Sequence, residues 1–111
     1  NDVCQLQKLN EIARNKVIDG MMENGVKIPC RDGIIIGKWV EVGSGTTILP
    51  GTILSGKTKI GRECVVGPNS QIIDCDVEDN VNITQSYCLN SSIKSGANVG
   101  PFASLVNQIT Q

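Results

Sequence analysis

The residues best suited to chemistry in this chain are its five cysteines, because a thiolate can attack an electrophile, bind a metal or form a disulfide. They are Cys4, Cys30, Cys64, Cys75 and Cys88. No two of them form a Cys-x-x-Cys pair and their number is odd, so the spacing indicates neither a zinc site nor a disulfide framework. We expect reduced, partly buried thiols, which are typical of a cytoplasmic protein.

Other groups that could carry out catalysis are scarce. The chain has no histidine, so its own residues cannot perform a reaction that needs an imidazole base. Lys57, Lys59, Arg62 and Lys94 are scattered among acidic residues, which favours solvated side chains over a phosphate-binding patch. The 10 Lys and Arg residues nearly balance the 11 Asp and Glu residues. This balance argues against a nucleic-acid partner, and no apolar run is long enough to cross a membrane.

The strongest pattern in the sequence is an aliphatic residue at every sixth position, a period that belongs to neither a strand nor a helix alone. The pattern is unbroken from Ile36 to Ile72, and beyond Ile72 it slips by one residue at some steps. Two residues before each of these positions, from Val40 to Ala103, lies a small or β-branched residue. The aliphatic series is Ile36, Val42, Ile48, Leu54, Ile60, Val66 and Ile72, followed by Val77, Ile83, Cys88, Ile93, Val99 and Leu105.

A six-residue unit predicts a short strand and a tight corner, and three units complete one triangular coil. The aliphatic residue would fill the inside of a face, and the small residue would lie inside near a corner, where glycine and asparagine tolerate unusual torsions. The sequence therefore predicts a mainly β protein, a parallel β-helix of hexapeptide repeats with about four coils over residues 36–105. Stacking of the coils would place inward side chains over one another in three columns, which we call ladders. They are Ile36, Leu54, Ile72, Cys88 and Leu105; Val42, Ile60, Val77 and Ile93; and Ile48, Val66, Ile83 and Val99.

Residues 1–24 predict one α-helix before the repeats. Asn1 or Asp2 can cap its start, and Asn24-Gly25 is typical of a helix end. Its apolar residues, spaced three and four apart, should form one stripe that needs a partner surface, either the open end of the solenoid or a neighbouring chain. These residues are Leu6, Leu9, Ile12, Ala13, Val17 and Met21.

The remaining divisions follow from these two elements. Residues 25–35 would connect the helix to the repeats, and residues 106–111 would form a polar tail. Trp39 falls at an outward position, where we expect the helix or a subunit contact to cover its indole. Since the first residue is Asn rather than Met, we expect the chain to be processed or excised from a longer one.

Four segments carry a resemblance to a known family. They are "ND" before the helix, "MENGVKI", "TTILPGTILSGKTKIGRECVVGPNSQIID" and "NVGPFASL". Together, from Asn1 to Leu105, they resemble the bacterial bifunctional N-acetylglucosamine-1-phosphate uridyltransferase/glucosamine-1-phosphate acetyltransferase. The resemblance implies a linker helix followed by the first turns of a left-handed β-helix that forms homotrimers. It also implies a cytoplasmic enzyme that makes UDP-N-acetylglucosamine for the cell envelope and uses acetyl-CoA and Mg²⁺.

The resemblance implies one candidate metal ligand. The family's uridyltransferase site holds magnesium through an aspartate and an asparagine, close to a glycine-rich loop. Asn1 matches that asparagine by its position before the helix, but Val3 stands where the family usually has arginine. The loop and the aspartate have no counterpart here. One amide oxygen cannot satisfy a cation that takes six ligands, so the alternative role of Asn1 is a helix cap.

The resemblance assigns no catalytic or cofactor-binding residue to this chain. The family's acetyltransferase histidine, and the residues that hold sugar phosphate and acetyl-CoA, lie on turns beyond the "GPFA" segment. Val106 stands about where a substrate-binding arginine is expected. We therefore expect the chain alone to be inactive in both reactions.

Three functions remain open from the sequence. The chain could be a segment of the bifunctional enzyme that contributes the linker, a trimerisation surface and the base of the acetyltransferase β-helix. It could instead be a stand-alone, non-catalytic scaffold or oligomerisation module. A third alternative is the regulatory β-helix of another sugar-1-phosphate nucleotidyltransferase, which the "MENGV" and "GPFA" segments fit less well.

Overall fold

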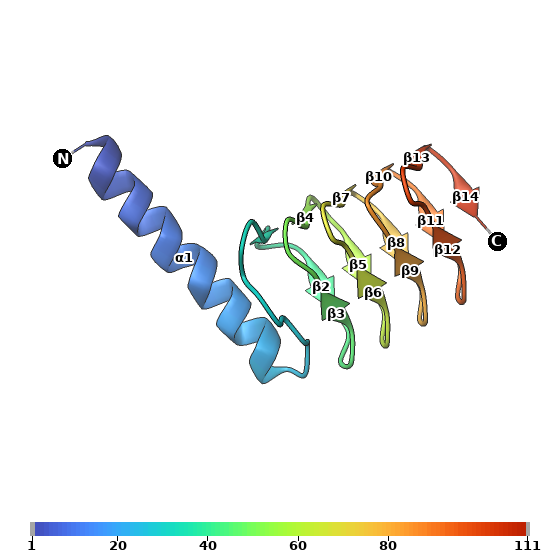
Figure 1. The fold of residues 1–111 in the computed structure, drawn as a ribbon, viewed down its shortest axis with the longest axis horizontal. Coiled ribbons are helices and arrows are strands. Elements are labelled where there is room, and N and C mark those ends of the chain that lie inside the picture. Colours follow the sequence, from blue (N-terminus) through green and yellow to red (C-terminus); the bar gives the residue numbers. More distant parts are fainter. Residues whose placement is uncertain (1, 111) are drawn as a thin grey trace.

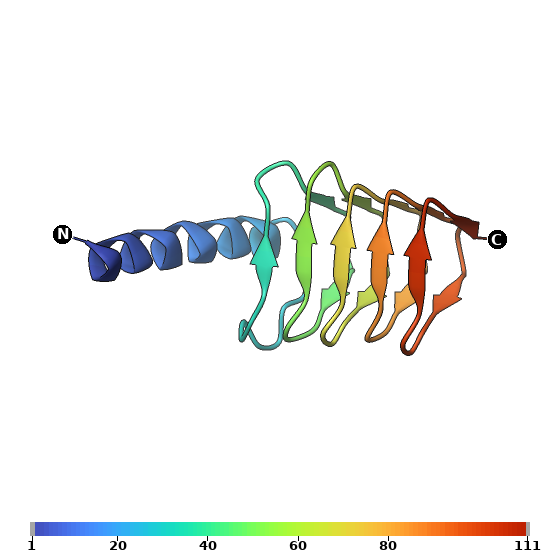
Figure 2. The same cartoon turned by 90° about the horizontal axis from the view of Figure 1, so that it is seen from above.

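A computed structural model describes residues 2–110 as one α-helix followed by a stack of parallel coils (Figure 1). The helix α1 spans Val3–Glu23, and the Asp2 carboxylate caps it by accepting a hydrogen bond from the Cys4 backbone N–H at 2.9 Å. It ends at Asn24, and Gly25 then adopts a positive φ of 92°. The helix extends away from the stack, so the two ends of the chain lie far apart (Figure 2).

Within the coils, short strands form three parallel sheets, which we call faces 1, 2 and 3. Face 1 contains β1 (Ile35–Ile36), β4 (Ile53–Ser55), β7 (Gln71–Ile73), β10 (Tyr87–Leu89) and β13 (Ser104–Val106). Face 2 contains β2 (Glu41–Val42), β5 (Lys59–Ile60), β8 (Asp76–Val77), β11 (Ser92–Ile93) and β14 (Ile109–Thr110). Face 3 contains β3 (Thr47–Ile48), β6 (Val65–Val66), β9 (Asn82–Ile83) and β12 (Asn98–Val99).

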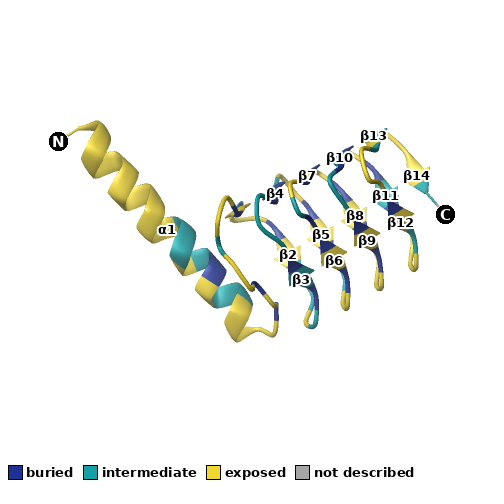
Figure 3. Ribbon diagram, in the orientation of Figure 1, coloured by how far each residue is buried: buried dark blue, intermediate teal, exposed yellow. Residues whose placement is uncertain are grey.

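The strand register confirms the three predicted ladders. On face 1, for example, Leu54 pairs with Ile36 on one side and with Ile72 on the other. Leu54, Ile72, Ile83 and Ile93 are completely buried, and the buried residues lie along the inside of the coils (Figure 3). A parallel β-helix of about four coils with one preceding helix is therefore the observed fold.

The small residues near the corners also lie inside, and their hydroxyl groups connect successive coils. Thr46 Oγ1 donates to the Gly61 carbonyl at 2.8 Å and accepts from the Cys64 backbone N–H at 3.0 Å. Ser86 Oγ repeats this arrangement one face away, accepting from the Ala103 N–H at 3.1 Å. These residues fill the narrow corner and also satisfy buried backbone groups, which would otherwise cost stability.

The corners explain why the six-residue phase slips. From Gly45 onward, every corner contains a residue with positive φ, mostly glycine or asparagine. Asp74, Gln85, Asn90 and Asn107 occupy corners that are one residue shorter, and all four have φ between 43° and 55°. A single left-handed residue thus turns the chain in five residues instead of six and keeps the inward ladder in register.

The β-helix extends beyond the predicted boundary at Leu105. Val106 is the last residue of β13, and β14 pairs in parallel with β11, with Thr110 opposite Ile93. Residues 106–110 therefore begin another coil rather than a polar tail. The sequence pattern missed this because Thr110 stands where the ladder has an aliphatic residue, while backbone pairing does not require one.

The inward ladder makes a direct prediction for stability. Ile83→Asp should lower the free energy of unfolding by several kcal/mol, because it places an unpaired carboxylate in a completely buried position. Asn82→Asp is the matched control, since Asn82 is exposed on the same strand. Urea denaturation followed by circular dichroism measures both. Equal stability of the two variants would contradict the register described here.

Candidate functional site

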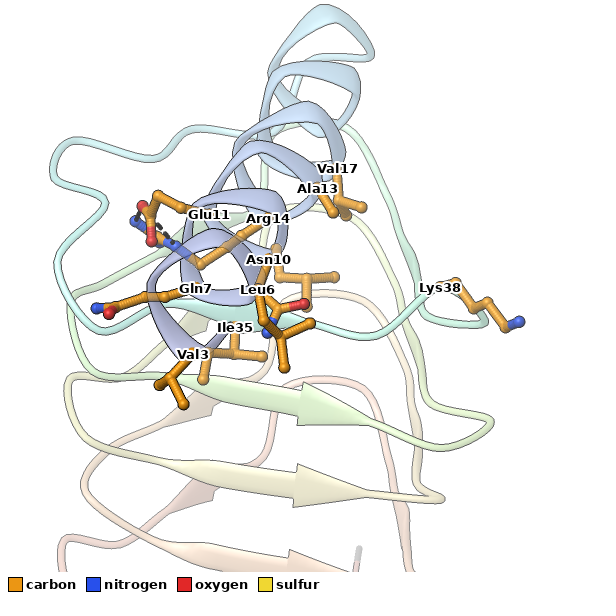
Figure 4. A pocket seen from close by; sticks show the side chains of 11 residues that line it. Val3, Leu6, Gln7, Asn10, Glu11, Ala13, Arg14, Val17, Ile35 and Lys38 are labelled. Carbon is orange, nitrogen blue, oxygen red and sulfur yellow. Dashed lines mark hydrogen bonds and ion pairs between the residues drawn. The ribbon is translucent and has the colours of Figure 1, made fainter. Parts of the chain in front are cut away.

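A hollow lies between α1 and the first coil. The helix packs on the solenoid only through its C-terminal half, where Ile18 is completely buried and Val17 and Met21 are partly buried. Its N-terminal half diverges and leaves a groove of about 680 Å³ beside β1. Val3 and Leu6 of the helix and Ile35 of β1 are among the residues that line this groove, and Figure 4 labels them.

Arg14 joins the helix to the open end of the solenoid. Its Nη1 donates to the carbonyl of Ile34 at 2.8 Å and to the carbonyl of Arg31 at 3.0 Å. Its Nη2 donates to the Glu11 carboxylate at 2.7 Å. Arg31 completes the joint by donating to Asp19 Oδ1 at 2.6 Å. The guanidinium groups of Arg14 and Arg31 thus fix the helix to the first coil.

The lining of the groove is suited to contact with an apolar surface and not to proton transfer. The hydrogen bond from Arg14 holds the pKa of the Glu11 carboxyl below its usual range, so Glu11 stays ionised near neutral pH. The same hydrogen bond raises the pKa of Arg14. The two side chains are therefore paired with each other. Lys38 extends away from the groove in Figure 4. The remaining lining is mostly aliphatic.

The solenoid covers only part of the predicted helix stripe. Leu6, Leu9 and Ile12 keep 58%, 64% and 64% of their surface exposed, so the solenoid of the same chain does not cover them; the other predicted partner, a neighbouring chain, stays a prediction. The row that actually touches the solenoid runs through Arg14 and Ile18. Sequence reasoning missed this row because Arg14 is polar, and its hydrogen bonds to backbone carbonyls leave no signal in hydrophobic spacing.

The candidate metal ligand Asn1 lies outside the described residues. Within residues 2–110, no group of three or more Cys, Asp or Glu side chains is arranged to hold a metal ion. Val106, which stands where the resemblance places a substrate-binding arginine, lies on face 1 with 40% of its surface exposed. Over the same residues, no helix is long and apolar enough to cross a membrane.

The thiols divide into two groups. Cys4 and Cys30 are exposed, whereas Cys64, Cys75 and Cys88 are buried inside the coils, and all five are free. Burial raises the pKa of Cys88 to about 12, with a smaller contribution from neighbouring Cys75. Burial also raises the pKa values of Cys64 and Cys75. The inner thiols are therefore protonated at neutral pH and act as small apolar side chains.

Trp39 is not covered by the helix, contrary to one of the two predictions for it. Its side chain is 67% exposed at the corner between faces 1 and 2. The Lys38 ammonium lies 5.1 Å from the centre of the indole ring, a cation–π distance. The alternative prediction, a subunit contact, stays a prediction.

Comparison with known proteins agrees with this architecture. Residues 40–74 match the family described as bacterial transferase hexapeptide (six repeats). The chain is 44% identical over 103 residues to the "Bifunctional protein GlmU" of Caldanaerobacter subterraneus, and 43% identical over 103 residues to that of Thermoanaerobacter pseudethanolicus. It is 41% identical over 108 residues to the one from Exiguobacterium. These alignments cover 93%, 93% and 97% of the chain but only 22% to 24% of the relatives.

The coils and the family match together define a hexapeptide-repeat protein of the left-handed β-helix class. Within that class, nearly the whole chain is similar to a segment that makes up about a fifth of the length of the bifunctional GlmU proteins. The resemblance inferred from the sequence is thereby confirmed.

Arg14 provides a test of the joint between helix and solenoid. Arg14→Ala should lower the free energy of unfolding by about 1–3 kcal/mol, because the Ile34 carbonyl at the solenoid end loses the guanidinium donor and the Arg31 carbonyl keeps only the Ile34 N–H. Lys16→Ala, an exposed helix position, should change little. Urea denaturation monitored by helical circular dichroism measures the difference. A loss no larger than that of Lys16→Ala would show that Arg14 does not stabilise the joint.

The thiols provide a second test, by alkylation under native conditions. Iodoacetamide at pH 8 should modify Cys4 and Cys30 in the folded chain, and all five thiols after denaturation, as measured by mass spectrometry. Rapid modification of Cys88 in the folded chain would contradict its burial.

The same thiols predict how stability depends on pH. Unfolded thiols ionise near pH 8.5, whereas the buried thiols stay protonated, so the unfolded state binds fewer protons above that pH. The free energy of unfolding should therefore fall as the pH rises above about 8.5. For Cys88 the fall should continue toward its folded pKa of about 12.

Proposed function

We propose that this chain supplies the structural base of a bifunctional enzyme that transfers acetyl and uridyl groups to make UDP-N-acetylglucosamine. In this role α1 is the linker helix, and the coils are the first turns of the acetyltransferase β-helix. The alignment with GlmU proteins over nearly the whole chain is the observation that carries the proposal. The chemistry itself would be performed by residues outside the segment described here.

The interior of the coils supports a structural role. Aliphatic side chains, thiols and hydroxyls fill it, and the hydroxyls are used in bonds between coils. The buried thiols have raised pKa values and are therefore poor nucleophiles. The groove beside α1 offers one carboxylate, Glu11, which is paired with Arg14. None of these groups is poised to deprotonate a sugar amine or to hold a nucleotide.

We further propose that the chain forms a homotrimer and acts in the cytoplasm. The similarity to GlmU proteins and the hexapeptide repeats support the trimer. Acetyl-CoA and Mg²⁺ would be used by the complete enzyme. Asn1 would serve at most as one of several magnesium ligands supplied by the rest of the protein.

Two measurements on the purified chain test this proposal. Incubation with acetyl-CoA and glucosamine-1-phosphate, or with UTP, Mg²⁺ and N-acetylglucosamine-1-phosphate, should give no product, because the chain has no histidine base and no nucleotide-binding loop. Turnover in either assay would overturn the structural role. Sedimentation should give three times the mass of one chain, and a monomer at all concentrations would rule out the trimer.

A fusion experiment distinguishes the base of a bifunctional enzyme from the alternative function, a stand-alone scaffold. Fusing this chain between the nucleotidyltransferase domain and the later coils of a GlmU relative should restore both activities if it is the base of such an enzyme. A fusion that is folded but inactive in acetyl transfer would favour the scaffold.

A further inference from the structure

From Ile35 onward, the charged residues of the β-helix are confined to one side. Between Ile35 and Thr110, all eleven lie on face 2 or on the two corners that border it, and face 1, face 3 and the corner between them contain none. Before Ile35, Lys27 pairs with Thr47 of face 3, and the Asp32 carbonyl accepts from the Gly51 N–H on the corner between faces 3 and 1, so charge on this side is limited to its N-terminal end. The charged residues are Lys38, Glu41, Lys57, Lys59, Arg62, Glu63, Asp74, Asp76, Glu78, Asp79 and Lys94.

The uncharged side carries exposed apolar side chains. Val65 on face 3 and Val106 on face 1 keep 39% and 40% of their surface exposed, and Phe102 on the corner between these faces keeps 81%. Depletion of charge together with exposed aliphatic and aromatic residues is the pattern of the centre of a protein interface. A solvated face of this size would be expected to carry Lys or Glu, as face 2 does.

Phe102 provides an independent indication. It adopts a positive φ of 61°, and the other corner residues with positive φ are Gly, Asn, Asp, Gln or Glu. A bulky side chain at such a φ is strained, and strain of this kind is found where another interaction holds the residue. Its own coil does not provide that interaction, because the phenyl ring is largely exposed. The compensating contact should therefore lie on another molecule.

The symmetry of a trimer decides how such surfaces can meet. The three faces of a triangular prism are turned about 120° from one another, and so are three copies around a parallel three-fold axis. No face of one copy can then lie flat against a face of another, because that would require a turn of 180°. A corner of one copy does point directly at a face of its neighbour. A cyclic trimer of these coils therefore needs one uncharged corner and one uncharged face.

We infer that the corner between faces 3 and 1, with Phe102 at its tip, packs against face 1 of the next copy around a three-fold axis. This inference rests on the proposed homotrimer and names the surface that forms it. The corner with Trp39 and face 2 would then point outward to solvent.

Face 1 is the more suitable partner of the two uncharged faces. Its outward side chains include Ile53, Ile73 and Leu89, which are half-buried and apolar. On face 3, the outward Asn82 donates a hydrogen bond to Asn98 at 2.9 Å, so this face presents a polar ladder. An apolar corner gains more by displacing water from face 1 than from face 3.

The corner is tested by Phe102→Asp. Aspartate tolerates a positive φ better than phenylalanine, so the coil should stay folded while the corner acquires a charge. Sedimentation equilibrium should show association at least ~30-fold weaker than for the unchanged chain, as expected for loss of an aromatic interface anchor. Ile109→Asp is the matched control, because Ile109 is also an exposed apolar residue of the last coil but lies on face 2. It should leave the trimer intact.

The choice of face is tested by two valines with the same exposure. Val106→Glu on face 1 should weaken association, and Val65→Glu on face 3 should not. The opposite result would overturn the assignment to face 1. Circular dichroism and thermal unfolding of each variant establish that the coils remain folded.

The outcomes separate this inference from the proposed function. A monomeric unchanged chain would refute the trimer and the inference together. A trimer that survives Phe102→Asp, or that is disrupted equally by Ile109→Asp, would refute the inference and leave the proposed homotrimer standing.

Discussion

Every coil must reproduce the path of the coil before it, because the backbone groups of each face bond to the coils above and below. The Thr47 N–H donates to the Cys64 carbonyl at 2.8 Å on the next coil, and the Ile48 N–H donates to the Lys27 carbonyl at 2.9 Å on the previous one. Residues of one ladder therefore lie directly over one another, which concentrates the aliphatic side chains in a continuous core. The ends of such a stack are its weak points, because their backbone groups face no further coil. Arg14 meets this need at the N-terminal end through the carbonyls of Arg31 and Ile34.

The features that repeat could be predicted from the sequence, and the features that occur once could not. The ladders containing Ile60 and Val66 follow from a period of six, and the buried Thr46 and Ser86 follow from the small residues two positions earlier. The joint made by Arg14 and Arg31 has no periodic signature, since it depends on where one guanidinium meets two carbonyls. The coil that continues to Thr110 was missed for a related reason, because its inward residue is not aliphatic. The candidate metal ligand Asn1 was not predicted from the repeat pattern. It was inferred only from its position in the related family, and it lies outside the described residues.

The distribution of charged residues over the faces, unlike the inward ladders, cannot be predicted from the period of six. Each charged residue, such as Lys59 or Asp76, follows no pattern in the sequence, and only the folded coils place all eleven charged residues between Ile35 and Thr110 on one side. The period of six that reveals the inward ladder does not reveal the outward faces, because the outward positions vary freely in size and polarity. The surface through which such a protein would meet its own copies is therefore a property of the three-dimensional arrangement. The proposed role as a base for catalytic coils would depend on that surface as much as on the core.

The shortened corners have a consequence for how a chain of this kind can change its length. In an ordinary sheet, loss of one residue within a strand turns every following side chain to the opposite face. Here the loss falls at Asp74 or Asn90, where one left-handed residue completes the turn, and the next strand still presents its aliphatic residue inward. Deletions of one residue at a corner are thus absorbed locally, while deletions within a strand are not. Such a solenoid can differ in the number of residues from coil to coil while its strands continue to pair along the whole stack.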